Sequence, residues 1–197
     1  MSPAQGAAAI AAALFFLAAV PFARADADAG RQKAAPCAAC HGSEGNSANP
    51  AVPSLAGQPA QFITMQLFQF REGNRKNEQM TPMAANLSNA DMNDLAAYFS
   101  ALKPAAPARQ ASPEHAAAAP ALTKKYNCVQ CHGPALVGQQ HIPRLAGQQV
   151  DYLRAQLRGF KAQTRADIDG IMTSAAQPLT EADIDALADY LSALPPR

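Results

Sequence analysis

Two short runs of sequence decide the organisation of this chain: CAACHG at Cys37–Gly42 and CVQCHG at Cys128–Gly133. The second run begins 91 residues after the first. Together they contain all 4 cysteines of the 197 residues. Each run places two thiols three positions apart and a histidine directly after the second thiol. The same chemistry is therefore predicted twice.

The sequence around the two runs is repeated as well. PSLAGQ at Pro53–Gln58 matches PRLAGQ at Pro143–Gln148, which lies 90 residues later. LSNADMNDLAAYFSAL at Leu87–Leu102 matches LTEADIDALADYLSAL at Leu179–Leu194, which lies 92 residues later. Two copies with their features in the same order indicate the duplication of one unit rather than a solenoid.

Each copy has the pattern of a helical unit. Ser88 and Thr180 each precede an aspartate by three residues, which is the spacing of a capping box at a helix start. Apolar residues then recur at spacings of three and four. An earlier helix is expected from Pro59 to Phe70, with its counterpart at Val150–Phe160. No alternating pattern of useful length indicates a strand, so the predicted fold is all-α with two similar domains.

The first 25 residues have the features of a cleaved export signal. Gly6–Val20 is an apolar run that is short for a membrane span, and Ala23–Ala25 has the small-x-small pattern of a cleavage site. No later stretch predicts a membrane helix. The predicted division of the chain is a signal peptide at 1–25, a first domain at 26–103, an Ala- and Pro-rich linker at 104–120 and a second domain at 121–197.

Several kinds of site use a Cys-x-x-Cys pair, namely disulfides, a redox pair, or a zinc site with ligands from both runs. None of them requires a histidine directly after the second cysteine in both copies. Covalent attachment of c-type haem does, because the two thiols add to the porphyrin vinyl groups and the adjacent imidazole ligates the iron. We therefore expect one haem on Cys37 and Cys40 with His41 as its axial ligand, and another on Cys128 and Cys131 with His132.

A methionine is favoured as the sixth iron ligand of each haem. The second half contains a single methionine, Met172, which lies seven residues before Leu179. Met80 lies seven residues before Leu87, the equivalent position, whereas Met83 has no counterpart. The repeat therefore selects Met80 and Met172, although methionine also fills hydrophobic cores.

The remaining histidines have no counterpart in the other half of the chain. His115 is interpreted as a linker residue and His141 as a loop residue, and a role as distal ligand is less favoured for either.

With histidine and methionine both bound, the iron has no open position for oxygen or peroxide. The soft thioether raises the reduction potential. The predicted chemistry is outer-sphere electron transfer.

With these features the chain resembles the cytochrome c family and, more closely, the two-domain dihaem cytochrome c4 family. The resemblance rests on both CxxCHG runs, both Pro-x-Leu-Ala-Gly-Gln runs, both methionine loops and both C-terminal helices, and it covers essentially all of the mature chain. It implies two tandem cytochrome c-like domains with two covalently bound haem c groups. It also implies that the carbonyls of Pro53 and Pro143 accept a hydrogen bond from the ligand histidines.

The resemblance implies a function too. By this resemblance, the chain is expected to be a periplasmic carrier that takes electrons from a quinol-oxidising complex to a terminal oxidase or reductase. It is not expected to be an enzyme. An alternative is the electron-accepting cytochrome subunit of a dehydrogenase, for example a flavoprotein sulfide dehydrogenase. A dihaem peroxidase is a third possibility. It needs unequal haems, and the matched Met80 and Met172 argue against it.

Charge adds little about partners. Cleavage after Ala25 removes Arg24 and no acid, which leaves 15 basic and 15 acidic residues. A chain without excess positive charge is a poor candidate for binding nucleic acid. The second half is locally basic, a pattern typical of a solvated face, of residues that balance haem propionates or of a surface for an acidic partner: Lys124, Lys125, Arg144, Arg154, Arg158, Lys161 and Arg165.

Overall fold

The computed structural model describes residues 25–196, so the predicted signal segment lies outside the described residues except for Ala25. Between these limits the chain is helical, and its only β pairing is an isolated bridge between Gln139 and Ile142. The predicted all-α class is confirmed. The helices are α1 (Ala27–Lys33), α2 (Ala35–His41), α3 (Ala60–Arg71), α4 (Met80–Ala84), α5 (Asn89–Ala101), α6 (Pro113–Lys125), α7 (Cys128–His132), α8 (Val150–Lys161), α9 (Ile171–Ala176) and α10 (Glu181–Ala193).

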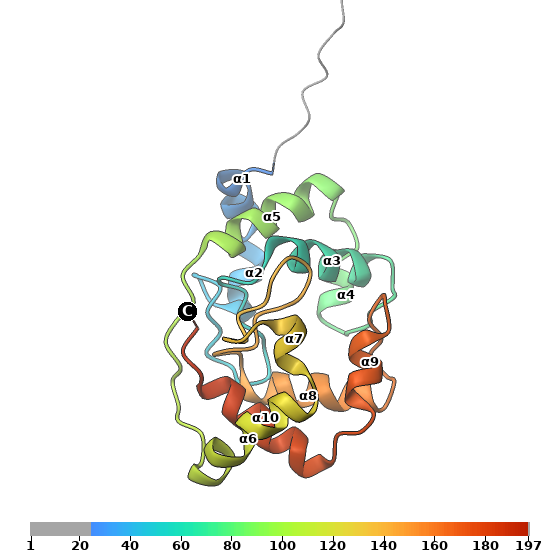
Figure 1. Cartoon of the computed structure of the whole chain (residues 1–197). Helices are drawn as coiled ribbons and strands as arrows, with labels where there is room; N and C mark the ends of the chain where they lie inside the picture. The colour runs from blue at the N-terminus through green and yellow to red at the C-terminus, as the bar shows by residue number, and fades with distance from the viewer. Residues whose placement is uncertain (1–24, 197) are drawn as a thin grey trace, which may run out of the picture.

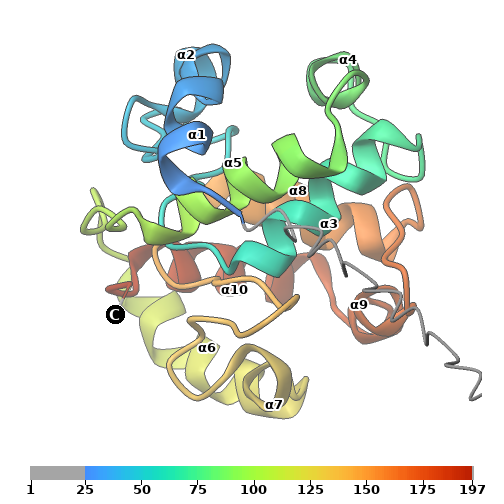
Figure 2. The same cartoon turned by 90° about the horizontal axis from the view of Figure 1, so that it is seen from above.

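The helices form two halves with the same order of elements. Figure 1 shows α1–α5 in one half and α6–α10 in the other, with the two halves packed side by side. In the view of Figure 2, α2 and α4 lie on one side of the molecule and α7 and α9 lie on the opposite side. None of the helices between residues 25 and 196 has both the length and the apolar character needed to cross a membrane.

Local sequence accounts for where the longer helices begin. Ser88 Oγ accepts the amide of Asp91 at 3.1 Å, and the Asp91 carboxylate accepts the amide of Ser88 at 3.0 Å. Thr180 and Asp183 make the same reciprocal pair at the start of α10. Each capping box satisfies two amides that the helix itself leaves without an acceptor. α3 begins directly after Pro59, as expected from the sequence.

Each half has its own hydrophobic core. The first is built between α1, α3 and α5, and the second between α6, α8 and α10. The helices α1 and α5 approach so closely that a Cβ atom on Gly30 would lie 2.0 Å from the carbonyl oxygen of Asp94. The buried residues of the first core are Ala34, Ile63, Leu95, Ala96, Tyr98 and Phe99, and those of the second are Leu136, Leu153, Phe160, Ala176, Leu179, Ile184, Leu187, Ala188 and Leu191.

The segment between the halves is attached to the second half. Residues 104–120 include the first part of α6, which begins at Pro113 after a Ser112 cap. The carboxylate of Asp189 on α10 accepts hydrogen bonds from the Ser112 amide at 2.9 Å and from His115 Nδ1 at 2.9 Å, and it pairs with Arg109. Burial of Asp189 favours its protonated form, but these donors outweigh burial and lower its pKa to about 2. His115 is thus occupied in fixing the segment.

The two halves contact each other through a reciprocal exchange of glutamines. Gln148 accepts the amide of Ser54 at 2.8 Å and donates to the Ser54 carbonyl at 2.9 Å. Gln58 accepts the amide of Arg144 at 3.0 Å and donates to the Arg144 carbonyl at 3.0 Å. The two glutamines are 90 residues apart in sequence, and so are Ser54 and Arg144, so the interface repeats the internal duplication with approximate twofold symmetry.

We expect Gln148→Ala to lower the free energy of unfolding of the haem-loaded protein by about 2 kcal/mol, because it leaves the buried amide and carbonyl of Ser54 without partners. For a chain of this size that corresponds to a midpoint lower by roughly 4–8 °C. Thermal unfolding measures it, with Gln61→Ala on the exposed face of α3 as the matched control. Equal midpoints for the two variants would contradict the role of the exchange.

Candidate functional site

The two CxxCHG runs form short helices that end at a glycine turn. α2 has a proline in its first turn, and both α2 and α7 end with the histidine of the run. Gly42 and Gly133 follow with φ of +82° and +80°, a conformation that favours glycine. A Cβ on Gly42 would also lie 2.3 Å from the carbonyl oxygen of Asn46. The final glycine of each run is therefore required by the turn that carries the chain away from the histidine.

All four cysteines are free thiols. Cys40 is exposed, and the other three are half-buried: Cys37, Cys128 and Cys131. Burial raises the pKa of Cys37 and of Cys128, which keeps these groups as thiols at neutral pH. The structure pairs none of them in a disulfide. Between residues 25 and 196 no three His, Cys, Asp or Glu side chains are grouped to hold a metal, so a zinc site assembled from both runs is not supported.

The two histidines are buried and identically oriented. His41 is 5% exposed and His132 is 4% exposed. Nδ1 of His41 lies 2.7 Å from the carbonyl oxygen of Pro53, and Nδ1 of His132 lies 2.8 Å from that of Pro143. A carbonyl oxygen only accepts hydrogen bonds, so Nδ1 must carry the proton. Burial lowers the pKa of both histidines, which favours neutral imidazole with the lone pair on Nε2 available to a metal.

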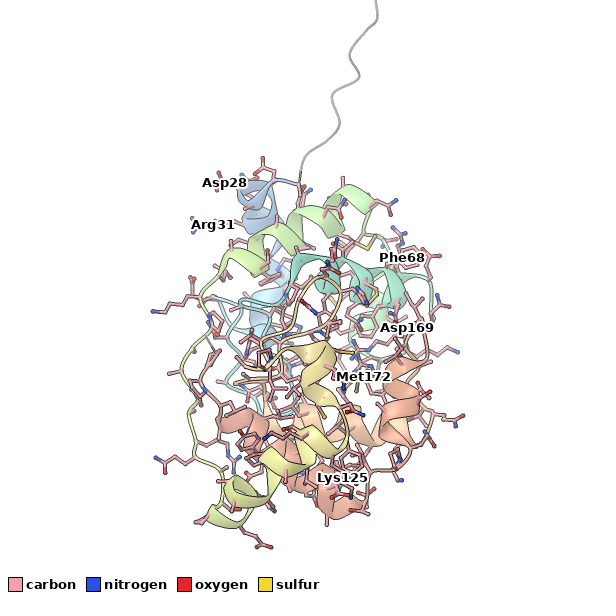
Figure 3. The ribbon with its side chains drawn as sticks, viewed as in Figure 1. Asp28, Arg31, Phe68, Lys125, Asp169 and Met172 are labelled. Atoms are coloured by element: carbon pink, nitrogen blue, oxygen red, sulfur yellow. The ribbon has the colours of Figure 1, made fainter. Side chains whose placement is uncertain are left out.

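The two selected methionines lie at equivalent places in the two halves. Met80 is the first residue of α4, and Met172 is the second residue of α9. Figure 3 labels Met172 among the side chains. Both are half-buried, and Met172 packs against the second core. Met83 is 47% exposed. Met80 is therefore the less exposed of the two methionines.

Each methionine is positioned by a polar side chain that sequence reasoning missed. The Asn77 side-chain oxygen accepts the Met80 amide at 2.8 Å. Asp167 accepts the amides of Met172 at 2.7 Å and Thr173 at 3.0 Å. Asn77 and Asp167 are 90 residues apart, so the repeat offset could have identified them as equivalent. Burial opposes ionisation of Asp167, but its hydrogen bonds prevail and lower its pKa.

Two guanidinium groups meet where the halves join. Arg75 donates to Gln66 at 2.6 Å and to Gln156 at 3.0 Å, and Arg165 donates to Gln156 at 2.5 Å and to Gln66 at 3.3 Å. Within residues 25–196 neither arginine is paired with a carboxylate, and the buried Nε of Arg165 has no hydrogen-bond partner. Burial lowers the Arg165 pKa to about 10.

These observations fit a haem in each half. Free thiols and a neutral imidazole with Nε2 available provide the covalent and axial contacts of a c-type haem. Arg75 and Arg165, neither of which forms an ion pair among residues 25–196, suit a cofactor that brings carboxylates, as the haem propionates do. By contrast, a surface cleft of about 540 Å³ between α3 and α5 is lined by no cysteine or histidine. That cleft is separate from the candidate site.

Comparison with known proteins places the chain among electron carriers. The family model for cytochrome c matches it twice, at residues 27–103 and 116–195. Cytochrome c4 of Thiocapsa roseopersicina is 41% identical over 181 residues, which cover 86% of this chain and 93% of the relative. The thiosulfate dehydrogenase electron acceptor of Thiomonas intermedia is 38% identical over 174 residues, which cover 83% of this chain and 80% of the relative.

A solved structure is similar in fold over nearly its whole length. Reduced recombinant cytochrome c4 from Pseudomonas stutzeri superposes with a TM-score of 0.81 at 36% identity. The match covers 86% of this chain and 98% of that one. The similarity therefore includes both halves and their relative placement.

Proposed function

The chain belongs to the cytochrome c family, as a dihaem electron carrier of the cytochrome c4 type with two covalently bound haem c groups, and we propose that it works in the periplasm between a quinol-oxidising complex and a terminal oxidase or reductase. In this proposal it is a carrier and not an enzyme. The predicted export signal supports the location. A bound haem would supply one-electron redox chemistry, and the chain would hold it so that electrons pass without a bond to the partner.

The proposal assigns four axial ligands, His41 and Met80 for the first haem and His132 and Met172 for the second. The observation that carries it is the matched pair of imidazole–carbonyl hydrogen bonds, His41 to Pro53 and His132 to Pro143. These bonds fix the orientation of each ring, and they would leave the lone pair of Nε2 free to hold iron. Cys37, Cys40, Cys128 and Cys131 form the thioether links. When bound, the haem supplies the redox chemistry, and the chain orients it.

Burial of the ligand histidines has a second role in the proposal. A buried imidazole is shielded from water and from protonation, so its bond to iron persists over a wide pH range. The potential of each haem then depends on its axial ligands and on the charges around it. With a histidine and a methionine both holding the iron, no position would remain for oxygen or peroxide, which would suit a carrier.

A second candidate function is the electron acceptor of a dehydrogenase. It is favoured by the relatives named thiosulfate dehydrogenase electron acceptor, at 38% and 36% identity. The test is stopped-flow mixing of the oxidised protein with a reduced thiosulfate dehydrogenase, and of the reduced protein with membranes that contain a terminal oxidase. Fast oxidation by the membranes with slow reduction by the dehydrogenase supports the carrier. The reverse order supports the acceptor.

The proposed ligation makes Asp167 a positioning residue for Met172. We expect Asp167→Ala to weaken the methionine–iron bond, because the amides of Met172 and Thr173 lose their acceptor, at a cost of about 1 kcal/mol, as for a lost helix cap. Added imidazole should then displace the methionine at roughly fivefold lower concentration. An optical titration of the ferric protein measures this.

The matched variant is Asp167→Asn, because asparagine already has this role in the first half at Asn77. Asp167→Asn should stay close to the parent protein in the imidazole titration. If Asp167→Ala and the parent protein bind imidazole equally well, Asp167 does not position Met172.

A further inference from the structure

The repeated Pro-x-Leu-Ala-Gly-Gln run differs between the halves at its second position. Ser54 occupies it in the first half and Arg144 in the second. Both residues are buried, at 5% and 2% exposure. Their main chains are held by equivalent glutamines, Gln148 and Gln58, each through an amide and a carbonyl. The same backbone position therefore carries a neutral side chain in one half and a charged one in the other.

Arg144 has no negative partner among residues 25–196. Its guanidinium donates to the carbonyl of Ala146 in its own half and, at 2.9 Å, to the carbonyl of Ala56 in the other half. Nε is buried without any hydrogen-bond partner. Burial lowers the pKa of Arg144 to about 10, which still leaves it charged at neutral pH. Neutral carbonyls do not balance a buried charge, so an anion is expected there.

Arg144 is adjacent in sequence to a residue that contacts the proposed histidine ligand of the second haem. Arg144 directly follows Pro143, whose carbonyl oxygen lies 2.8 Å from Nδ1 of His132. By contrast, the cationic pair Arg75 and Arg165 is related by the 90-residue offset and so contributes to both halves alike. Each of them also lies over an equivalent phenylalanine ring, Phe70 or Phe160. Arg144 is therefore a buried positive charge that the repeat does not duplicate.

We propose that Arg144 makes the two haems unequal: it pairs with a propionate of the haem attached at Cys128 and Cys131 and raises the reduction potential of that haem. The inference rests on the proposed function. Ferric haem carries one more positive charge than ferrous haem, and a nearby cation therefore disfavours the ferric state. Propionates favour the ferric state, and a guanidinium that neutralises one removes that preference. Electrons that enter the molecule therefore collect in the second half.

The experiment is a redox titration of the full two-haem protein followed by proton NMR, in which the shifted methyl signals report each haem separately. Arg144→Ser reproduces the residue of the first half. At a fixed applied potential near the midpoint, we expect the ferrous-to-ferric ratio of the second haem to fall about tenfold, or about 59 mV for one electron. The first haem should change less. Arg158→Ser, which removes an exposed arginine paired with Glu181, is the control and should change neither.

Two further variants separate charge from structure. Arg144→Lys keeps the charge and loses the planar fork, and Arg144→Gln keeps much of the size and loses the charge. The lysine variant should retain most of the raised reduction potential of the second haem, and the glutamine variant should lose it. A purely structural role predicts that both variants behave alike. If Arg144→Ser does not retain its haems, Arg144→Gln replaces it in the redox titration.

Unchanged potentials in Arg144→Gln, or equal shifts in the lysine and glutamine variants, would overturn the inference. The first result would mean that water satisfies Nε and that no propionate pairs with the side chain. In either case two haems with thioether bands would leave the proposed function standing. A parent protein without two methionine-ligated haems would instead refute the proposed function.

Discussion

Met172→Ala should abolish the ferric iron–thioether absorption band of the second haem and lower its reduction potential by on the order of 0.1 V or more, within the range of about 0.8 V that axial ligands span. The reason is the loss of the soft thioether that favours ferrous iron. The same variant should open a coordination position, so the second haem should bind cyanide or carbon monoxide. Absorption spectra and a redox titration measure both effects.

Met83→Ala is the matched control for this prediction. Met83 is 47% exposed and has no counterpart in the second half, so its loss should leave both thioether bands in place. Met80→Ala should have the effect of Met172→Ala, but on the first haem. A protein in which Met83→Ala removes a band and Met80→Ala does not would contradict the ligand assignment in the first half.

The double variant Cys37→Ala/Cys40→Ala should carry a single covalent haem and lose the folded structure of residues 26–103. The first core is built around a cluster of six buried residues, and two of them are alanines. A small domain with so few large buried side chains depends on its cofactor for stability. Intact mass gives the haem count, and hydrogen exchange of the amides reports on each half separately.

The corresponding variant of the second half, Cys128→Ala/Cys131→Ala, is the comparison. The second core has nine buried residues, among them Leu153, Ile184 and Leu187. It should therefore keep more protected amides without its haem than the first half does. If the first half stays fully protected in Cys37→Ala/Cys40→Ala, its core is sufficient alone and the haem is not required for folding.

The arrangement within each half was predictable because the signals are local. Capping boxes at Ser88 and Thr180 and the apolar spacing after them predict helix starts that α5 and α10 confirm. The repeat also selected Met80, which the structure shows to be less exposed than Met83. These predictions need only spacing within one segment or the comparison of two copies.

The contacts between the halves were not predicted. The exchange of Gln58 and Gln148 joins segments 86 and 94 residues apart, and no local pattern specifies such a pairing. The role of the basic residues in the second half was equally ambiguous, because sequence spacing does not reveal which of them form ion pairs with acidic residues. Arg154 and Arg158 form ion pairs with acids of α8 and α10, as expected of a solvated face, whereas Arg144 is buried.

The assignment of matched histidine–methionine ligation in both halves is tested most directly by one combined measurement on the purified holoprotein. The ferric absorption spectrum is recorded through a redox titration, and the covalent haem count is taken from the intact mass of the same sample. We predict two haems per chain, both with the thioether band and both at positive potential. A haem at low potential without that band would contradict the account.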